Sequence, residues 1–112
     1  MCKISVVNVY READGAEYIG RQNARLGKAA SPLANPFVLK EYGGKYTRDE
    51  SVDAYREWLA EKIAARDAAV CDELNRLYGI AKTHGSLKLA CFCSPQRCHG
   101  DVVKQVLLQK LG

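Results

Sequence analysis

Three of the five cysteines and one of the two histidines of this chain fall within residues 91–101. They are Cys91, Cys93, Cys98 and His99, and Asp101 closes the segment. An apolar run precedes the segment and an amphipathic run follows it, which predicts a strand, a tight loop and the start of a helix. In open α/β sheets, ligands and reactions collect at such junctions, because strand ends form a crevice and helix N-termini attract anions.

The candidate catalytic residues are Cys98, His99 and Asp101. A helix N-terminus favours the thiolate form of a cysteine, so Cys98 is a candidate nucleophile. A histidine titrates near neutral pH, so His99 could act as a general acid or base. Asp101 could orient His99 or simply complement the helix dipole. The structural alternative is favoured for Cys91, which is expected to be a small core residue, and Cys98 could also fill a gap in the core.

Zinc is an alternative use of the same residues, since Cys91, Cys93, Cys98 and His99 supply the four ligands that a structural site needs. Their spacing is unlike the usual ribbons, because it lacks two Cys-x-x-Cys knuckles and places Cys98 and His99 side by side. Zinc is therefore a possible cofactor of the alternative function and not of the leading one.

A second group of residues could bind an anion or a polar ring. Arg21 follows Gly20 at a strand end, where glycine allows close approach and the arginine fork suits phosphate or carboxylate. Arg48, at a helix start, and Cys93 are further candidate ligand-binding residues. Asn35 precedes a proline, so its amide could initiate a turn or contact a base or ribose edge, and both interpretations stay open.

The elements that would position these residues follow from periodicity. Strands are predicted over residues 3–10 and 17–21, paired as a hairpin, and a loop covers residues 22–37. A capping box of Thr47 and Glu50 opens a helix with an apolar stripe. The helical pattern stops near Gly79 and is either two helices joined near residues 64–69 or one long bent helix. A turn over residues 82–86, a buried strand over 87–91 and a helix over 101–111 complete the chain.

Composition limits the classes of function. The 112 residues, 47% of them hydrophobic, fit a single domain over residues 1–112. No apolar run is long enough to cross a membrane, and the N-terminus reads as a strand and not as a signal peptide. Five cysteines are then expected to be reduced thiols or metal ligands in a cytoplasmic protein. A net charge of +4 is mild, which makes nucleic acid an unfavoured partner and suits a small anionic ligand.

Four motifs occur in one order along the chain. They are Tyr18-Ile19-Gly20-Arg21, Ser31-Pro32-Leu33-Ala34-Asn35-Pro36-Phe37, Tyr55-Arg56-Glu57-Trp58-Leu59 and Cys91-Phe92-Cys93-Ser94-Pro95-Gln96-Arg97-Cys98-His99-Gly100-Asp101. With them the chain resembles the bacterial and phage family called "domain of unknown function 4326", in which tryptophan is more frequent at the position of Phe92. The chain is also loosely similar to small Rossmann-like domains that bind nucleotides or nucleosides. These resemblances imply a fold and candidate site residues, but no activity.

The sequence therefore predicts a small α/β sandwich of sheet and helices, Rossmann-like, that binds and could process a nucleotide-like or nucleoside-like ligand. Whether it is an enzyme stays open. The alternative is a zinc-stabilised, non-catalytic module that binds nucleic acid or a protein partner. A third hypothesis is thiol redox sensing by Cys93 and Cys98.

Overall fold

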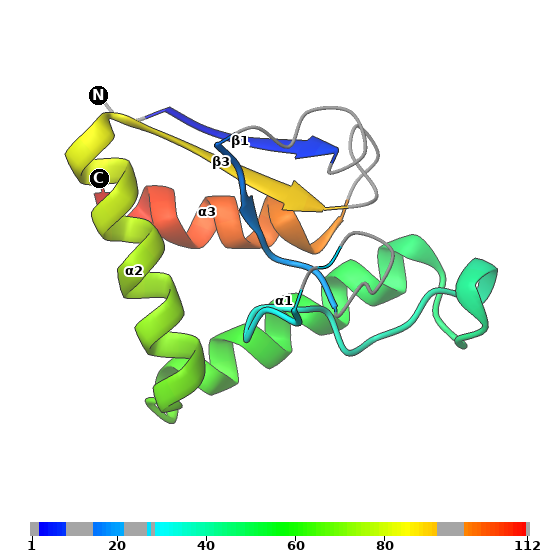
Figure 1. Ribbon diagram of the computed structural model, residues 1–112. Coiled ribbons are helices and arrows are strands. Elements are labelled where there is room, and N and C mark those ends of the chain that lie inside the picture. The colour runs from blue at the N-terminus through cyan, green and yellow to red at the C-terminus, as the bar shows by residue number, and fades with distance from the viewer. Residues whose placement is uncertain (1–2, 9–14, 22–26, 28, 92–97, 112) are drawn as a thin grey trace.

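The computed structural model describes residues 3–8, 15–21, 27, 29–91 and 98–111. Figure 1 shows the strands as one layer with the helices on one side of it. The expected α/β class is thereby confirmed. In chain order the elements are β1 (Lys3–Asn8), β2 (Glu17–Tyr18), the 3-10 helix η2 (Lys40–Tyr42), α1 (Arg48–Ala64), α2 (Ala68–His84), β3 (Ser86–Cys91) and α3 (His99–Leu111).

The strands form one parallel sheet in the order β1-β3-β2. β1 and β3 pair along their whole length, from Lys3 opposite Ser86 to Asn8 opposite Cys91. β2 is only two residues long, and it pairs with the other edge of β3. The predicted hairpin between the first two strands is therefore wrong. β3 is the central strand, and its last three residues are all buried.

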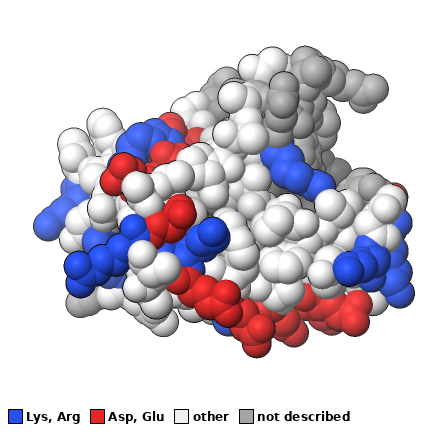
Figure 2. All heavy atoms as spheres, turned by 90° about the horizontal axis from the view of Figure 1, so that it is seen from below, with Lys and Arg blue, Asp and Glu red and all other residues white. Residues whose placement is uncertain are grey.

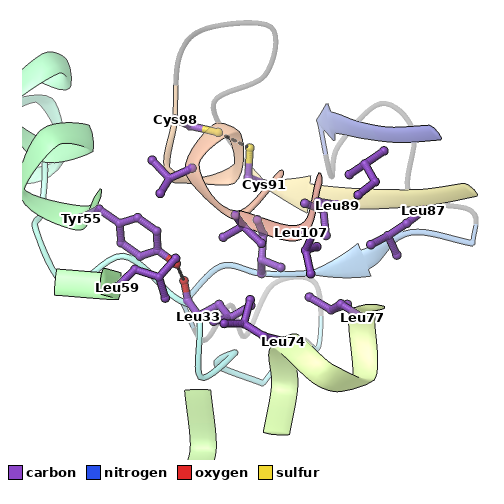
Figure 3. Close-up of a cluster of buried hydrophobic side chains, with 14 of the residues drawn as sticks. Leu33, Tyr55, Leu59, Leu74, Leu77, Leu87, Leu89, Cys91, Cys98 and Leu107 are labelled. Atoms are coloured by element: carbon purple, nitrogen blue, oxygen red, sulfur yellow. Dashed lines mark hydrogen bonds between the residues drawn. The ribbon is translucent and has the colours of Figure 1, made fainter. Parts of the chain in front are cut away.

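The core lies between the sheet and the helices. Alternate residues of β1 and β3 face the same side of the sheet, so Ile4 and Leu87 point together toward the helices. Figure 3 shows side chains from the strands, from all three helices and from the segment before η2 meeting in one cluster. Its fully buried members include Ile19, Leu33, Tyr55, Leu59, Leu77, Leu89, Val103 and Leu107.

The Rossmann-like arrangement is not confirmed. A doubly wound sheet carries helices on both of its faces. Within the described ranges, α1, α2 and α3 all lie on the same side of the sheet (Figure 1). The structure therefore supports the general α/β class and not the more specific comparison.

The long helical pattern is two helices, and Arg66 separates them. The N–H groups of Arg66 and Asp67 donate to the carbonyls of Ile63 and Lys62, at 3.0 Å each. This is the Schellman motif that ends many helices, with Arg66 in the left-handed conformation at φ 57°. The Asp67 carboxylate then accepts from the N–H of Val70 at 3.1 Å and caps α2.

The helix boundaries correct several of the expected ones. α1 begins at the predicted capping box, in which Thr47 and Glu50 exchange hydrogen bonds. α2 does not stop near Gly79 but continues to His84, where Gly85 at φ 73° closes it. Most of the predicted turn over residues 82–86 is therefore helix. α3 starts at His99, two residues earlier than predicted.

In the described part of the chain, no helix has both the length and the apolar character that crossing a membrane requires.

Candidate functional site

The carboxyl ends of the three strands meet at one edge of the sheet, because the strands are parallel. Residues 19–21 leave this edge after β2, and α3 begins beside it after β3 (Figure 1). Arg21 and the Cys98 to Asp101 turn therefore both follow strands that end at this edge. This is the position where open α/β sheets bind ligands.

His99, the first residue of α3, connects the two segments. Its side chain is buried, and its Nε2 atom lies 2.8 Å from the carbonyl oxygen of Ile19. A carbonyl oxygen only accepts, so Nε2 carries the proton and donates it to this bond. The His99 ring also meets the Tyr55 ring edge to face, with 5.1 Å between centroids. His99 therefore holds residue 19 and helix α1 to the start of α3.

Burial lowers the pKa of His99, because the charged imidazolium loses its hydration. The hydrogen bond to Ile19 acts in the opposite direction, while the positive charge of Arg21 lowers the pKa further and Asp101 raises it. At neutral pH the ring is therefore neutral, with the proton on Nε2 and the lone pair on Nδ1.

Cys98 precedes α3 and is buried, as is Cys91 at the end of β3. Their Sγ atoms lie 3.0 Å apart, and Figure 3 shows the two sulfurs pointing toward each other above the apolar cluster. The two cysteines are not joined by a disulfide. The expectation that Cys91 is a core residue is confirmed. Cys98 shares that environment, and burial together with nearby Cys98 raises the pKa of the Tyr55 hydroxyl.

Asp101 caps the first turn of α3. Its carboxylate accepts from the N–H of Cys98 at 3.2 Å, and its own N–H donates to the carbonyl of Cys98 at 3.1 Å. Of the two roles predicted for Asp101, complementing the helix N-terminus describes these contacts. Gly100 lies between β1 and the residues after β2, where a Cβ atom would stand 2.9 Å from Val6 Cγ1.

The Tyr18 side chain lies so close to residue 20 that only glycine fits there. A Cβ atom at Gly20 would stand 2.5 Å from the Tyr18 hydroxyl oxygen, because that ring folds over the glycine and its hydroxyl donates to the carbonyl of Arg21. The carbonyl of Gly20 also accepts from the N–H of Ser31 at 2.9 Å. These contacts fix the backbone of Arg21, while its side chain is exposed.

The remaining predicted ligand-binding residues have protein partners or lie outside the described residues. Asn35 donates to Ser51 Oγ at 2.8 Å and accepts from the N–H of Phe37 at 2.9 Å, so its amide forms the predicted turn. Arg48 pairs with Glu41 of η2 at 2.9 Å. Cys93 lies outside the described residues, so its predicted role stays a prediction.

A metal site is not seen in the described part of the chain, where no three His, Cys, Asp or Glu side chains come together. Of the four alternative zinc ligands, Cys91 and Cys98 are adjacent, whereas His99 directs Nε2 to the Ile19 carbonyl. A zinc site with these ligands would therefore also need Cys93, which lies outside the described residues.

Sequence reasoning assigned Tyr55 to the core and missed its part in the site. The Tyr55 hydroxyl donates to the carbonyl of Leu33 at 2.7 Å while its ring supports His99. Ser51 was also missed, although it is buried and bonds both Asn35 and the carbonyl of Phe37. Their positions on the buried side of a helix gave no signal beyond packing.

Fold and site together define a small α/β protein with a parallel sheet and a Cys-His turn at its carboxyl edge. The family model described as "Domain of unknown function (DUF4326)" matches residues 4–109, so the chain belongs to this family. Comparison with curated proteins and with solved structures finds no match.

Proposed function

We propose that this domain binds a small anionic, nucleotide-like ligand at the carboxyl edge of its sheet. The observation that carries the proposal is the hydrogen bond between His99 and Ile19. It holds the chain after β2 against the first turn of α3, so that the exposed guanidinium of Arg21 and a helix N-terminus share one edge. Helix N–H groups and an arginine fork are two common recognition elements for phosphate.

The charge distribution supports a compact anion over a nucleic acid. Helix α1 carries exposed acidic residues at every fourth position, Asp49, Asp53, Glu57 and Glu61. Figure 2 shows acidic side chains in a row on the helical side of the molecule. A phosphate backbone needs an extended basic surface, which this face does not offer. An anionic ligand is therefore expected at the strand-end edge and not on the helices.

Any chemistry at the site would use the residues at the start of α3. The neutral His99 ring offers Nδ1 as a proton acceptor, and the helix N-terminus favours a thiolate at Cys98. Asp101 would act by holding this turn in place. A cytoplasmic location and the processing of a nucleotide-like or nucleoside-like ligand belong to the same proposal.

Calorimetric titration with a panel of nucleotides and nucleosides tests the proposal. Nucleotides are expected to bind and to raise the melting temperature, and nucleosides to bind more weakly because they lack phosphate. Arg21→Gln should weaken nucleotide binding by roughly ten-fold or more, the effect of one charge-assisted hydrogen bond. Arg56→Gln, an exposed arginine of α1 paired with Asp53, is the matched control.

Absence of heat and of any melting shift across the panel would end the proposal. Equal losses in both variants would show a general charge effect and no site at Arg21. Native mass spectrometry of the purified chain adds a separate answer, since one bound zinc lost on chelation would support the metal-stabilised alternative.

A further inference from the structure

The proximity of Cys91 to Cys98 is a second feature, which the proposed ligand binding does not require. Their sulfurs are 3.0 Å apart across the junction between β3 and α3, and the two side chains are only 1% and 3% exposed. We propose that this pair is an oxidation site, which closes to a reversible intramolecular disulfide when the protein meets a peroxide or a small-molecule disulfide.

The distance between the Cys91 and Cys98 sulfurs favours a disulfide between them. A disulfide bond is about 2.05 Å long, so the two sulfurs need to approach by only about 1 Å. Both belong to segments with defined positions, the last residue of the central strand and the residue that precedes α3. The closing movement therefore requires a small adjustment of side chains and no rearrangement of the sheet.

Cys98 is the thiol expected to react first. It lies at the N-terminus of a helix of thirteen residues, where the dipole favours a thiolate. Its thiolate attacks one oxygen of hydrogen peroxide and breaks the O–O bond, giving a sulfenic acid and a hydroxide that takes the released proton. The Cys91 sulfur then attacks the Cys98 sulfur, the S–O bond breaks and water leaves. Two thiols and one peroxide thus give one disulfide and two waters.

The first turn of α3 is packed around these sulfurs. A Cβ atom at Gly100 would stand 3.3 Å from Cys98 Sγ, so helix and thiol pair are in direct contact. A disulfide here would fix the start of α3 to the end of β3. Closing this short loop should raise the melting temperature by roughly 5–15 °C in the oxidised protein.

Burial gives the reaction a kinetic signature. Peroxide reaches a buried thiol only when the surrounding chain opens, whereas Cys71 on α2 is half-buried. Cys71 therefore serves as an internal reference for accessibility. Once Cys98 is oxidised, its sulfenic acid should be short-lived because Cys91 is already adjacent.

The test treats the full-length chain with hydrogen peroxide or oxidised glutathione, blocks the remaining thiols and maps the peptides by mass spectrometry. A cross-link between Cys91 and Cys98, reversed by dithiothreitol, is the expected result in the wild type and in Cys93→Ser. In Cys91→Ser, a sulfenic acid trap such as dimedone should label Cys98 several-fold more than in the wild type. Circular dichroism shows whether each variant is folded.

A cross-link that joins Cys93 to either partner would overturn the assignment. So would two intact thiols after prolonged treatment, long enough for the chain to open repeatedly and for Cys71 to be fully oxidised. Because the wild-type peptide map decides the question alone, a variant that does not fold leaves the test valid. The outcome is independent of ligand binding at the strand-end edge.

Discussion

The Nε2 atom of His99 lies 2.8 Å from the carbonyl oxygen of Ile19, and the two residues are eighty positions apart in the chain. This bond joins the first turn of α3 to the segment that leaves β2. It is also the reason that Arg21 stands at the edge where the candidate site lies. The ring, flanked by Tyr55, is buried and neutral at neutral pH.

The folded state should lose stability as the pH falls, because of His99. Its pKa is lowered in the folded state, so below the ordinary value of 6.5 the unfolded chain binds the proton more readily. The contribution of His99 is complete above that value and is lost as the pH falls through it toward the folded-state pKa. Urea unfolding between pH 7 and about pH 5 should show this slope. His99→Gln, which keeps a donor but cannot titrate, should flatten the slope.

Gly100 and Gly79 should respond in opposite directions to the same substitution. Gly100→Ala places a Cβ atom 2.9 Å from Val6 and 3.3 Å from Ile19, so overpacking is expected to cost about 1–3 kcal/mol. Gly79→Ala in α2 meets no atom within 4 Å and should stabilise the protein by about 0.5–1 kcal/mol through helix propensity. Thermal and urea unfolding of both variants checks the pair. A neutral Gly100→Ala would contradict the close packing of α3 on β1.

Replacing Arg66 should stabilise the link between α1 and α2. Its left-handed backbone costs a side-chain-bearing residue about 1 kcal/mol that glycine does not incur. Arg66→Gly is expected to raise the free energy of unfolding by a few tenths to about 1 kcal/mol. The gain is smaller than the relieved strain because glycine also adds conformational entropy to the unfolded chain. Arg66→Ala is the control, because it removes the same side chain and keeps the strain. Equal effects of the two substitutions would place the cause in the side chain.

The Tyr55 hydroxyl should matter for stability apart from its ring. Tyr55→Phe keeps the packing against His99 but leaves the buried carbonyl of Leu33 without its donor. The expected loss is about 1–2 kcal/mol in urea unfolding. Tyr78→Phe, at a half-buried position of α2, is the matched control and should change stability by less than about 0.5 kcal/mol. A loss no larger than the control would show that water can replace the Tyr55 hydroxyl.

The parts of the fold that depend on local pattern were predictable. The capping box of Thr47, the buried strand before Cys91 and the helix after it each follow from residues close together in sequence. Of the two alternatives for the long helical pattern, two helices joined near residues 64–69 is the one observed. The left-handed conformation of Arg66 was not predictable, because a Schellman motif usually has glycine at that position. α2 passes through Gly79, since its buried residues continue to Ala81.

The site was predictable in its location but not in its contacts. Strand ends and a Cys-His turn marked the edge, whereas pairing of β2 with β3 joins residues some seventy positions apart and displaced the local hairpin. The acceptor for His99 is a backbone carbonyl, which every residue carries, so no residue type could have indicated Ile19. The redox hypothesis named Cys93 and Cys98. Cys93 lies outside the described residues, and within them the thiol adjacent to Cys98 is Cys91.

The strand order β1-β3-β2 has a consequence for folding during synthesis on the ribosome. The two edge strands are made first, but each can pair only with a central strand that is made last, at residues 86–91. Until β3 emerges, β1 and β2 lack the strand with which they pair in the sheet. Their unpaired edges can then hydrogen-bond to other chains. Nascent chains halted before Ser86 are therefore expected to aggregate or recruit chaperones, and addition of β3 and α3 to convert them into a cooperative fold.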